Sequence, residues 1–245
     1  MSFTPEEKKS GYPSLYADFS LQVPDYYNFG FDVIDQWAIK NPASPALLWV
    51  NQDGEEKRFT FADLKNESDL ALKILQDRGI RKGDRVLILL PRIPAWWFFI
   101  IALIKLGAVY SPAPTMLTSK DISYRIITGK FALIITDSEN APKVSLGLDE
   151  SGLAVSCMIV DGKQTGWTSY PAERASLKQQ SAVPRPTRPE MTKATDPLVI
   201  FFTSGTTGNP KMVLHPHSYP LGHIITARLW QDLKPSDLHF TISDT

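Results

Sequence analysis

A stretch rich in small hydroxyl residues lies near the carboxyl end of the 245-residue chain. It consists of Thr203, Ser204, Gly205, Thr206, Thr207, Gly208, Asn209, Pro210 and Lys211. Side chains without bulk let backbone N–H groups approach an anion, and hydroxyl groups add further donors. Lys211 adds a mobile positive charge with three donors. These residue types favour a loop that binds phosphate oxygens.

Two familiar phosphate-binding fingerprints do not fit this loop. A Walker A pattern starting at Gly205 would need its second glycine at Pro210, and Ser or Thr in place of Met212. A dinucleotide fingerprint would need a leading G-x-G, which the loop lacks. A polar hairpin tip is the alternative, because Thr, Ser, Gly, Asn and Pro are common turn residues. The length of the run and the Pro-Lys pair at its exit favour the phosphate loop.

The loop needs two strands to hold it. The apolar run 197–202 precedes it, and the run 212–215 follows it, so we expect a strand on each side. A helix over about 218–233 and the start of a further strand over 238–242 are predicted next.

Apolar strands and helices alternate upstream of the loop. The predicted strands cover 46–50, 57–60, 83–90, 109–111, 131–136 and 155–160, and the predicted helices cover 31–40, 61–78, 94–107, 118–128 and 138–148. Thr60 with Asp63 is expected to form a capping box, and Thr118 is expected to cap a helix that Gly129 ends. Continuous apolar runs are typical of strands buried on both faces. The pattern predicts a layered α/β/α fold with a mostly parallel sheet.

The pattern divides the chain into four parts. An aromatic-rich arm over 1–30 is expected to pack on the surface of a first α/β subdomain over 31–160. A linker over 161–196, rich in Ser, Thr, Gln and Pro and without apolar periodicity, leads to the start of a second α/β subdomain over 197–245.

Composition limits the class of protein. Lys and Arg number 26 and Asp and Glu number 26, so charge gives no reason to expect nucleic acid as a partner. The single cysteine, Cys157, excludes an intrachain disulfide and favours a cytoplasmic protein. The start of the chain lacks the apolar core of a signal peptide, and the apolar run 95–104 is too short to span a membrane.

A few other side chains could carry chemistry. His215 and His217 are two residues apart on a predicted strand, so they would face the same way as a metal pair or as two structural histidines beside the loop. Trp96 and Trp97 suggest core packing more than a ligand cage. Arg92 between two prolines favours a structural tether over an anion contact, and Cys157 is expected to be buried and inert.

The loop resembles the signature loop of the adenylate-forming superfamily, which includes acyl-CoA synthetases. The segments 90–97, 115–125 and 211–217 are most similar to the acetyl- and medium-chain acyl-CoA synthetase branch. The similarity runs from about residue 28 to residue 245 and implies the amino-terminal part, incomplete, of the large domain of such an enzyme.

The resemblance implies a two-step ligase reaction. A carboxylate attacks the α-phosphate of ATP to give an acyl-adenylate and pyrophosphate, and coenzyme A then displaces AMP. In the loop, Thr203, Ser204, Thr206 and Thr207 would donate hydroxyls, Gly205 and Gly208 would allow close backbone approach, and Lys211 would offset charge. Mg²⁺ would be shared with the phosphates, and the carboxylate would be a short- or medium-chain fatty acid.

The chain also departs from the family pattern. The family's adenine-binding segment, acidic Mg²⁺ ligand, ribose-binding aspartate and catalytic lysine have no matching position here. We therefore expect an amino-terminal fragment, with no catalytic residue beyond the loop and no metal ligand. The alternative is an inactive remnant or an interaction module that keeps the fold.

Overall fold

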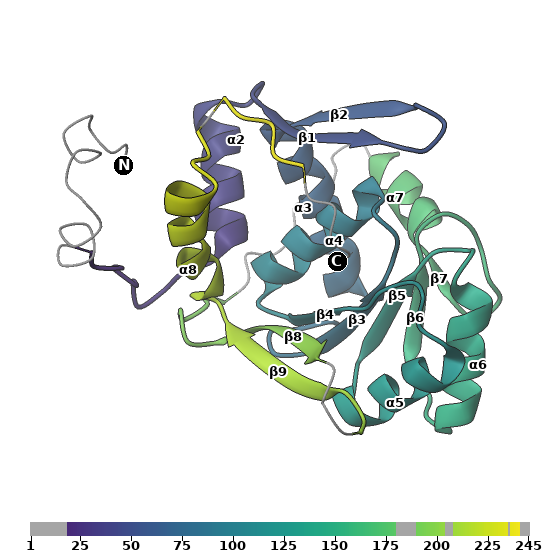
Figure 1. Cartoon of the computed structure of the whole chain (residues 1–245). Coiled ribbons are helices and arrows are strands. Elements are labelled where there is room, and N and C mark those ends of the chain that lie inside the picture. Colours follow the sequence, from purple (N-terminus) through teal and green to yellow (C-terminus); the bar gives the residue numbers. More distant parts are fainter. Residues whose placement is uncertain (1–18, 180–189, 204–207, 235, 241–245) are drawn as a thin grey trace.

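A mostly parallel sheet organises the computed structural model, which describes residues 19–179, 190–203, 208–234 and 236–240 (Figure 1). Within these residues the sheet has seven strands in the order β7-β6-β5-β3-β4-β8-β9, and β1 and β2 form a separate antiparallel pair. The strands are β1 Pro45–Val50, β2 Glu56–Thr60, β3 Arg85–Leu89, β4 Val109–Pro112, β5 Leu133–Thr136, β6 Ser156–Ile159, β7 Thr168–Ser169, β8 Pro197–Thr203 and β9 Lys211–Pro216.

Helices connect these strands. The α-helices are α2 Gln36–Lys40, α3 Phe61–Asp77, α4 Pro94–Leu106, α5 Ser119–Gly129, α6 Ala141–Ser151, α7 Tyr170–Lys178 and α8 Tyr219–Ile225, and two π-helical segments are η1 Gly30–Asp35 and η2 Thr226–Trp230. Strand β3 pairs in parallel with β4 and β5, and β8 pairs in parallel with β4. The last strand, β9, is antiparallel to β8.

The two faces of the sheet are buried by different helices. Val86 and Ile88 of β3 belong to a core cluster with residues of α3, α4 and α7, whereas Leu87 and Leu89 pack with residues of α5 and α6. Alternate residues of a strand point to opposite faces, so a continuous apolar run serves both layers. Figure 1 shows α5 and α6 on one side of the sheet and α3 and α4 on the other. The predicted layered α/β/α fold is confirmed.

Local signals set the helix ends. Thr60 and Asp63 form a reciprocal capping box at the start of α3, as the sequence predicts. Thr118 forms the same arrangement with Asp121 at the start of α5. Gly129 is the last residue of α5, and Lys130 rather than a glycine takes the left-handed conformation, with φ of 52°.

A buried charge lies in α4. Lys105 is fully buried, and its Nζ lies 2.7 Å from Asp35 Oδ1 and 2.7 Å from Asp69 Oδ1. Lys105 also donates to Ser68 Oγ at 3.0 Å. Burial raises the pKa of the Asp35 carboxyl, and the Lys105 ammonium opposes that change. This cluster fixes η1 and α3 against α4.

The segment 161–196 differs from the predicted linker. Strand β7 and helix α7 form within it, and residues 180–189 lie outside the described part. Tyr170 and Leu177 of α7 are buried, and the Phe99 and Tyr170 ring centroids are 4.8 Å apart. Arg174 donates to both carboxylate oxygens of Glu67 in α3. Contacts distant in sequence therefore stabilise α7 against α3 and α4.

The last part of the chain also differs from the prediction. The expected helix 218–233 is divided into α8 and η2. Residues 238–240 have no strand, and 241–245 lie outside the described residues. Strands β8 and β9 belong to the same sheet as β3 and β4. In the described part of the chain, the two expected subdomains therefore share one sheet.

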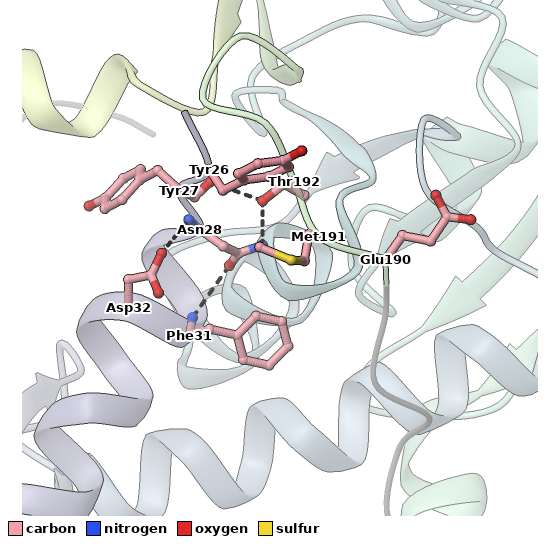
Figure 2. A pocket seen from close by; sticks show the side chains of 8 residues that line it. All are labelled: Tyr26, Tyr27, Asn28, Phe31, Asp32, Glu190, Met191 and Thr192. Carbon is pink, nitrogen blue, oxygen red and sulfur yellow. Dashed lines mark hydrogen bonds between the residues drawn. The ribbon is translucent and has the colours of Figure 1, made fainter. Parts of the chain in front are cut away.

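The amino-terminal arm is fastened at Asn28 (Figure 2). The Asn28 side chain donates to the Ile104 carbonyl at 2.7 Å and to Thr192 Oγ1 at 3.2 Å, and its Oδ1 accepts from the backbone N–H groups of Gly30 and Phe31. We call this set of bonds the Asn28 clasp. Residues 1–18, which include the aromatics Phe3, Tyr12 and Tyr16, lie outside the described part.

The aromatics next to the clasp are buried to different degrees. Tyr27 is buried, whereas Tyr26 is 49% exposed and Phe19 is 46% exposed. Burial and the Asp32 carboxylate raise the pKa of the Tyr27 phenol to about 12. A small cavity of about 110 Å³ lies beside the clasp, lined by Tyr26, Tyr27, Asn28, Phe31, Asp32, Glu190, Met191 and Thr192.

Candidate phosphate-binding loop

The hydroxyl-rich loop follows the carboxyl end of β8 (Figure 1). Because β8 runs parallel to β4, this end lies at the edge where the parallel strands of the sheet finish. Open α/β sheets bind ligands outside the carboxyl ends of their strands. The fold thus places the loop at the edge suited to a ligand, whereas the Asn28 clasp lies near the amino end of β8.

The loop is closed by the two strands that flank it. Thr203 and Lys211 are partners in the β8–β9 register, and Thr203 Oγ1 donates to the Lys211 carbonyl at 3.4 Å. Thr203, Gly208, Asn209 and Lys211 are exposed, so the Asn209 amide and the Lys211 ammonium can meet an anion in solution. Residues 204–207, which are Ser204, Gly205, Thr206 and Thr207, lie outside the described residues.

Gly208 has a backbone conformation that suits glycine. Its φ is 114°, a region that other residues rarely adopt. An added Cβ would find no atom of the described residues within 4 Å, so the conformation favours glycine there. Pro210, two residues after Gly208, is half-buried and directly precedes β9.

Helix α5 contacts both sides of the loop. The Tyr124 hydroxyl donates to the Pro210 carbonyl at 3.0 Å, and the Tyr124 ring packs edge-on against Phe202 with centroids 6.4 Å apart. Sequence reasoning did not single out Tyr124, although it lies in the stretch 115–125 that resembles the superfamily. Only the folded chain brings α5 beside the end of β8.

Arg125 places a buried positive charge next to the last residues of β8. Its guanidinium carbon lies 4.9 Å from the centre of the Phe202 ring, and its Nη1 donates to the Asp121 carbonyl at 3.2 Å. Burial lowers the pKa of Arg125 and the Asp121 carboxylate opposes that change, yet arginine keeps its charge in proteins. This fixed cation favours anions near the loop.

His215 lies on β9, four residues along the strand from Lys211, in a row of rings. Its ring is 4.2 Å from that of Tyr219 and 5.7 Å from that of Phe201, and Tyr219 in turn contacts His223 at 4.6 Å. The row joins β8, β9 and α8. His215 thus has ring partners on neighbouring elements rather than a ligand pair on its own strand.

His217 has different surroundings from His215. His217 follows the last residue of β9, and its backbone N–H donates to the Asp196 carbonyl. Because it lies outside the strand, its side chain does not have to face the same way as that of His215. The side chain is 1% exposed, and neither ring nitrogen has a hydrogen-bond partner among the described residues. Burial lowers its pKa to about 4, while Asp196 raises the pKa and Lys82 lowers it further.

The remaining sequence candidates have structural surroundings. The Trp96 and Trp97 rings pack edge-on at 5.3 Å, and Trp96 lies against the main core. The Arg92 carbonyl accepts a hydrogen bond from Trp49 Nε1 at 2.6 Å. Cys157 is buried, as expected, and burial raises the pKa of its thiol to about 12.

The fold is that of an α/β protein in which a hydroxyl-rich segment follows β8, at the edge where the parallel strands finish. The model of the family described as AMP-binding enzyme matches residues 34–243 of this chain. The chain therefore belongs to the AMP-binding enzyme family, and the predicted family is confirmed.

Curated relatives and a solved structure support this assignment. The chain is 39% identical over 244 residues to human acyl-coenzyme A synthetase ACSM3, mitochondrial, an alignment covering 96% of this chain and 41% of the relative. It is 38% identical over 231 residues to human acyl-coenzyme A synthetase ACSM5, mitochondrial, covering 91% and 39%. An acyl-CoA synthetase from Brucella canis is similar in structure, with a TM-score of 0.81, 26% identity, and coverage of 93% of this chain and 42% of that one.

The chain spans about 41% of the length of the first of these relatives. The names of both human relatives assign those proteins to mitochondria, and a cytoplasmic location for this chain stays a prediction. In the part of the chain that the structure describes, no helix is both long enough and apolar enough to cross a membrane.

Proposed function

We propose that this chain forms the phosphate-binding part of an ATP-dependent acyl-CoA synthetase. In that reaction a carboxylate displaces pyrophosphate from ATP, and the thiol of coenzyme A then displaces AMP from the acyl-adenylate. Family membership and the acyl-coenzyme A synthetase relatives support the reaction class. The substrate we propose is a short- or medium-chain fatty acid, from the resemblance of segments 90–97 and 115–125.

The role of the loop is to hold the leaving phosphates. Negative charge grows on pyrophosphate as it leaves, and donors that already face those oxygens stabilise the charge without rearrangement. The exposed Thr203 hydroxyl, the Gly208 backbone and the Lys211 ammonium would serve this purpose, with the hydroxyls of Ser204, Thr206 and Thr207. The observation that carries the proposal is the position of this donor-rich loop at the carboxyl edge of the sheet.

Mg²⁺ enters the proposal with the nucleotide. Among the described residues, no three His, Cys, Asp or Glu side chains gather to hold a metal ion. Hydroxyl groups and a lysine suit phosphate oxygens better than a cation, so the loop fits the phosphates themselves and no residue is assigned as a metal ligand. When bound, Mg²⁺ would neutralise charge on the phosphate oxygens.

The proposal predicts that Lys211→Ala weakens phosphate binding. A hydrogen bond to a charged group contributes about 1.5–3 kcal/mol, so we expect the Kd for pyrophosphate to rise roughly 10- to 150-fold. Isothermal titration calorimetry with pyrophosphate, and separately with ATP and Mg²⁺, measures this.

Lys163→Ala is the matched control. Lys163 is exposed in the loop that follows β6 at the same edge of the sheet, and its loss changes the net charge equally. An equal effect of both variants would point to general electrostatics, and unchanged affinity in Lys211→Ala would contradict the loop assignment.

A further inference from the structure

A single side chain connects the entrance and the exit of the loop. The Tyr124 ring packs against Phe202, one residue before the loop begins, and its hydroxyl donates to Pro210, one residue before Lys211. Tyr124 and Pro210 are 86 positions apart in sequence. Proline has no N–H, so its carbonyl is the one backbone hydrogen-bonding group at that position.

Helix α5 is a rigid support for Tyr124. The helix begins with the Thr118–Asp121 capping box, and Ile122 and Ile126 are fully buried in the core. Gly147 of α6 lies so close to α5 that an added Cβ would come within 2.7 Å of Ile122 Cγ2. The position of the Tyr124 hydroxyl is thus set by the core of the protein.

We propose that Tyr124 is a positioning residue for the phosphate loop. It fixes the backbone at Pro210 so that the next residue, Lys211, is held in place when phosphate arrives. A loop whose exit is already fixed loses less conformational freedom on binding, and preorganisation of this kind increases affinity. The inference rests on the proposed function, because it assigns Tyr124 to the same ligand.

Tyr124→Phe tests the proposal because it removes only the hydroxyl and keeps the ring against Phe202. We expect the Kd for pyrophosphate to rise about fivefold, because this is the change in affinity that corresponds to the loss of one ordinary hydrogen bond. In the ligand-free chain, nuclear magnetic resonance should show a shifted carbonyl carbon signal for Pro210. The matched control is Thr128→Val, which deletes another α5 hydroxyl that bonds within the helix, to the Tyr124 carbonyl at 2.8 Å.

The outcomes separate this inference from the proposed function. Weaker binding in Tyr124→Phe, with the affinity of Thr128→Val unchanged and equal thermal midpoints, supports a positioning role. If Lys211→Ala weakens binding and Tyr124→Phe does not, the proposed function stands and the inference is wrong. If the parent chain binds neither pyrophosphate nor ATP, the proposed function fails for this chain and the inference fails with it. An unshifted Pro210 signal would also overturn the inference.

Discussion

Burial fixes the charge state of individual side chains in this protein, and His217 is the clearest case. Its ring is 1% exposed, and its pKa is lowered from 6.5 to about 4 by loss of solvent. The Asp196 carboxylate, which raises the pKa, and the Lys82 ammonium, which lowers it, both act on the ring. Between pH 6.5 and about pH 4 the unfolded chain therefore binds a proton at His217 that the folded chain does not.

This difference predicts a loss of stability in acid. The free energy of unfolding should fall as the pH drops from 6.5 to about 4, by up to about 3 kcal/mol from this residue. His217→Phe should remove that part of the slope, whatever it does to stability at neutral pH. Urea unfolding at several pH values measures the slope.

His239→Gln is the control, because it removes a histidine from the exposed surface and leaves His217 in place. A slope in His217→Phe equal to that of the parent would contradict the burial argument.

Residue types alone predict the loop but not its surroundings. The run from Thr203 to Lys211 predicts a phosphate-binding loop because the sequence itself gives the small size and the hydroxyl groups of its residues. Tyr124 and Arg125 are ordinary helix residues in the sequence, and their role depends on α5 lying beside β8. The roles of the loop residues themselves stay predictions until binding is measured.

Packing between elements determines where α5 can lie. Gly147 of α6 faces α5, and an added Cβ would lie 2.7 Å from Ile122 Cγ2 and 3.1 Å from the Ser119 carbonyl oxygen. The carbonyl belongs to the backbone, so only movement of a whole helix relieves the second contact.

We therefore predict that Gly147→Ala destabilises the fold although alanine favours helices. Overpacking costs about 1–3 kcal/mol, which exceeds the roughly 0.5–1 kcal/mol that alanine gains over glycine in a helix. The thermal midpoint should fall by about 4 °C. Gly222→Ala in α8, where a Cβ meets no atom within 4 Å in the described part of the chain, should keep or raise the midpoint. A thermal midpoint for Gly147→Ala at or above that of the parent would show that α5 and α6 can accommodate the added methyl group, and would contradict the prediction.

Elements with strong local signals could be predicted, and those held by distant contacts could not. The capping boxes at Thr60 and Thr118 fix α3 and α5 from neighbouring residues. Helix α7 was not predicted because it depends on Glu67, far away in α3, whose pKa is lowered by hydrogen bonds from Arg174 and Lys178 against the effect of burial. The Lys105 cluster is likewise absent from any local pattern, because its carboxylates come from η1 and α3.

At the scale of the whole molecule, the elements around the loop are well packed, whereas the last helical elements of the chain are exposed. Helix α8 and segment η2, both fully described, contain no buried residue, and Trp230 is 83% exposed. The chain spans about 41% of the length of human ACSM3. We therefore expect binding of phosphate without the complete reaction.

The resulting prediction is that the 245-residue chain alone forms no acyl-CoA. The test is a coupled assay for pyrophosphate release with ATP, Mg²⁺, coenzyme A and a panel of short- and medium-chain acids. The rate of pyrophosphate release with the chain should equal the rate in buffer without protein. Human ACSM3 in the same assay is the positive control. Turnover by the chain at a rate comparable to that of the control would contradict the prediction.

The Asn28 clasp has a consequence for the order of events during synthesis. Asn28 bonds to the Ile104 carbonyl, 76 residues later, and to Thr192, 164 residues later. A ribosome adds about 5–20 residues per second, so Thr192 is made roughly 8–33 s after Asn28. Until then the Asn28 side-chain amide can donate only to the Ile104 carbonyl, and the arm gains its bond to Thr192 after strands β3 to β6 have been made.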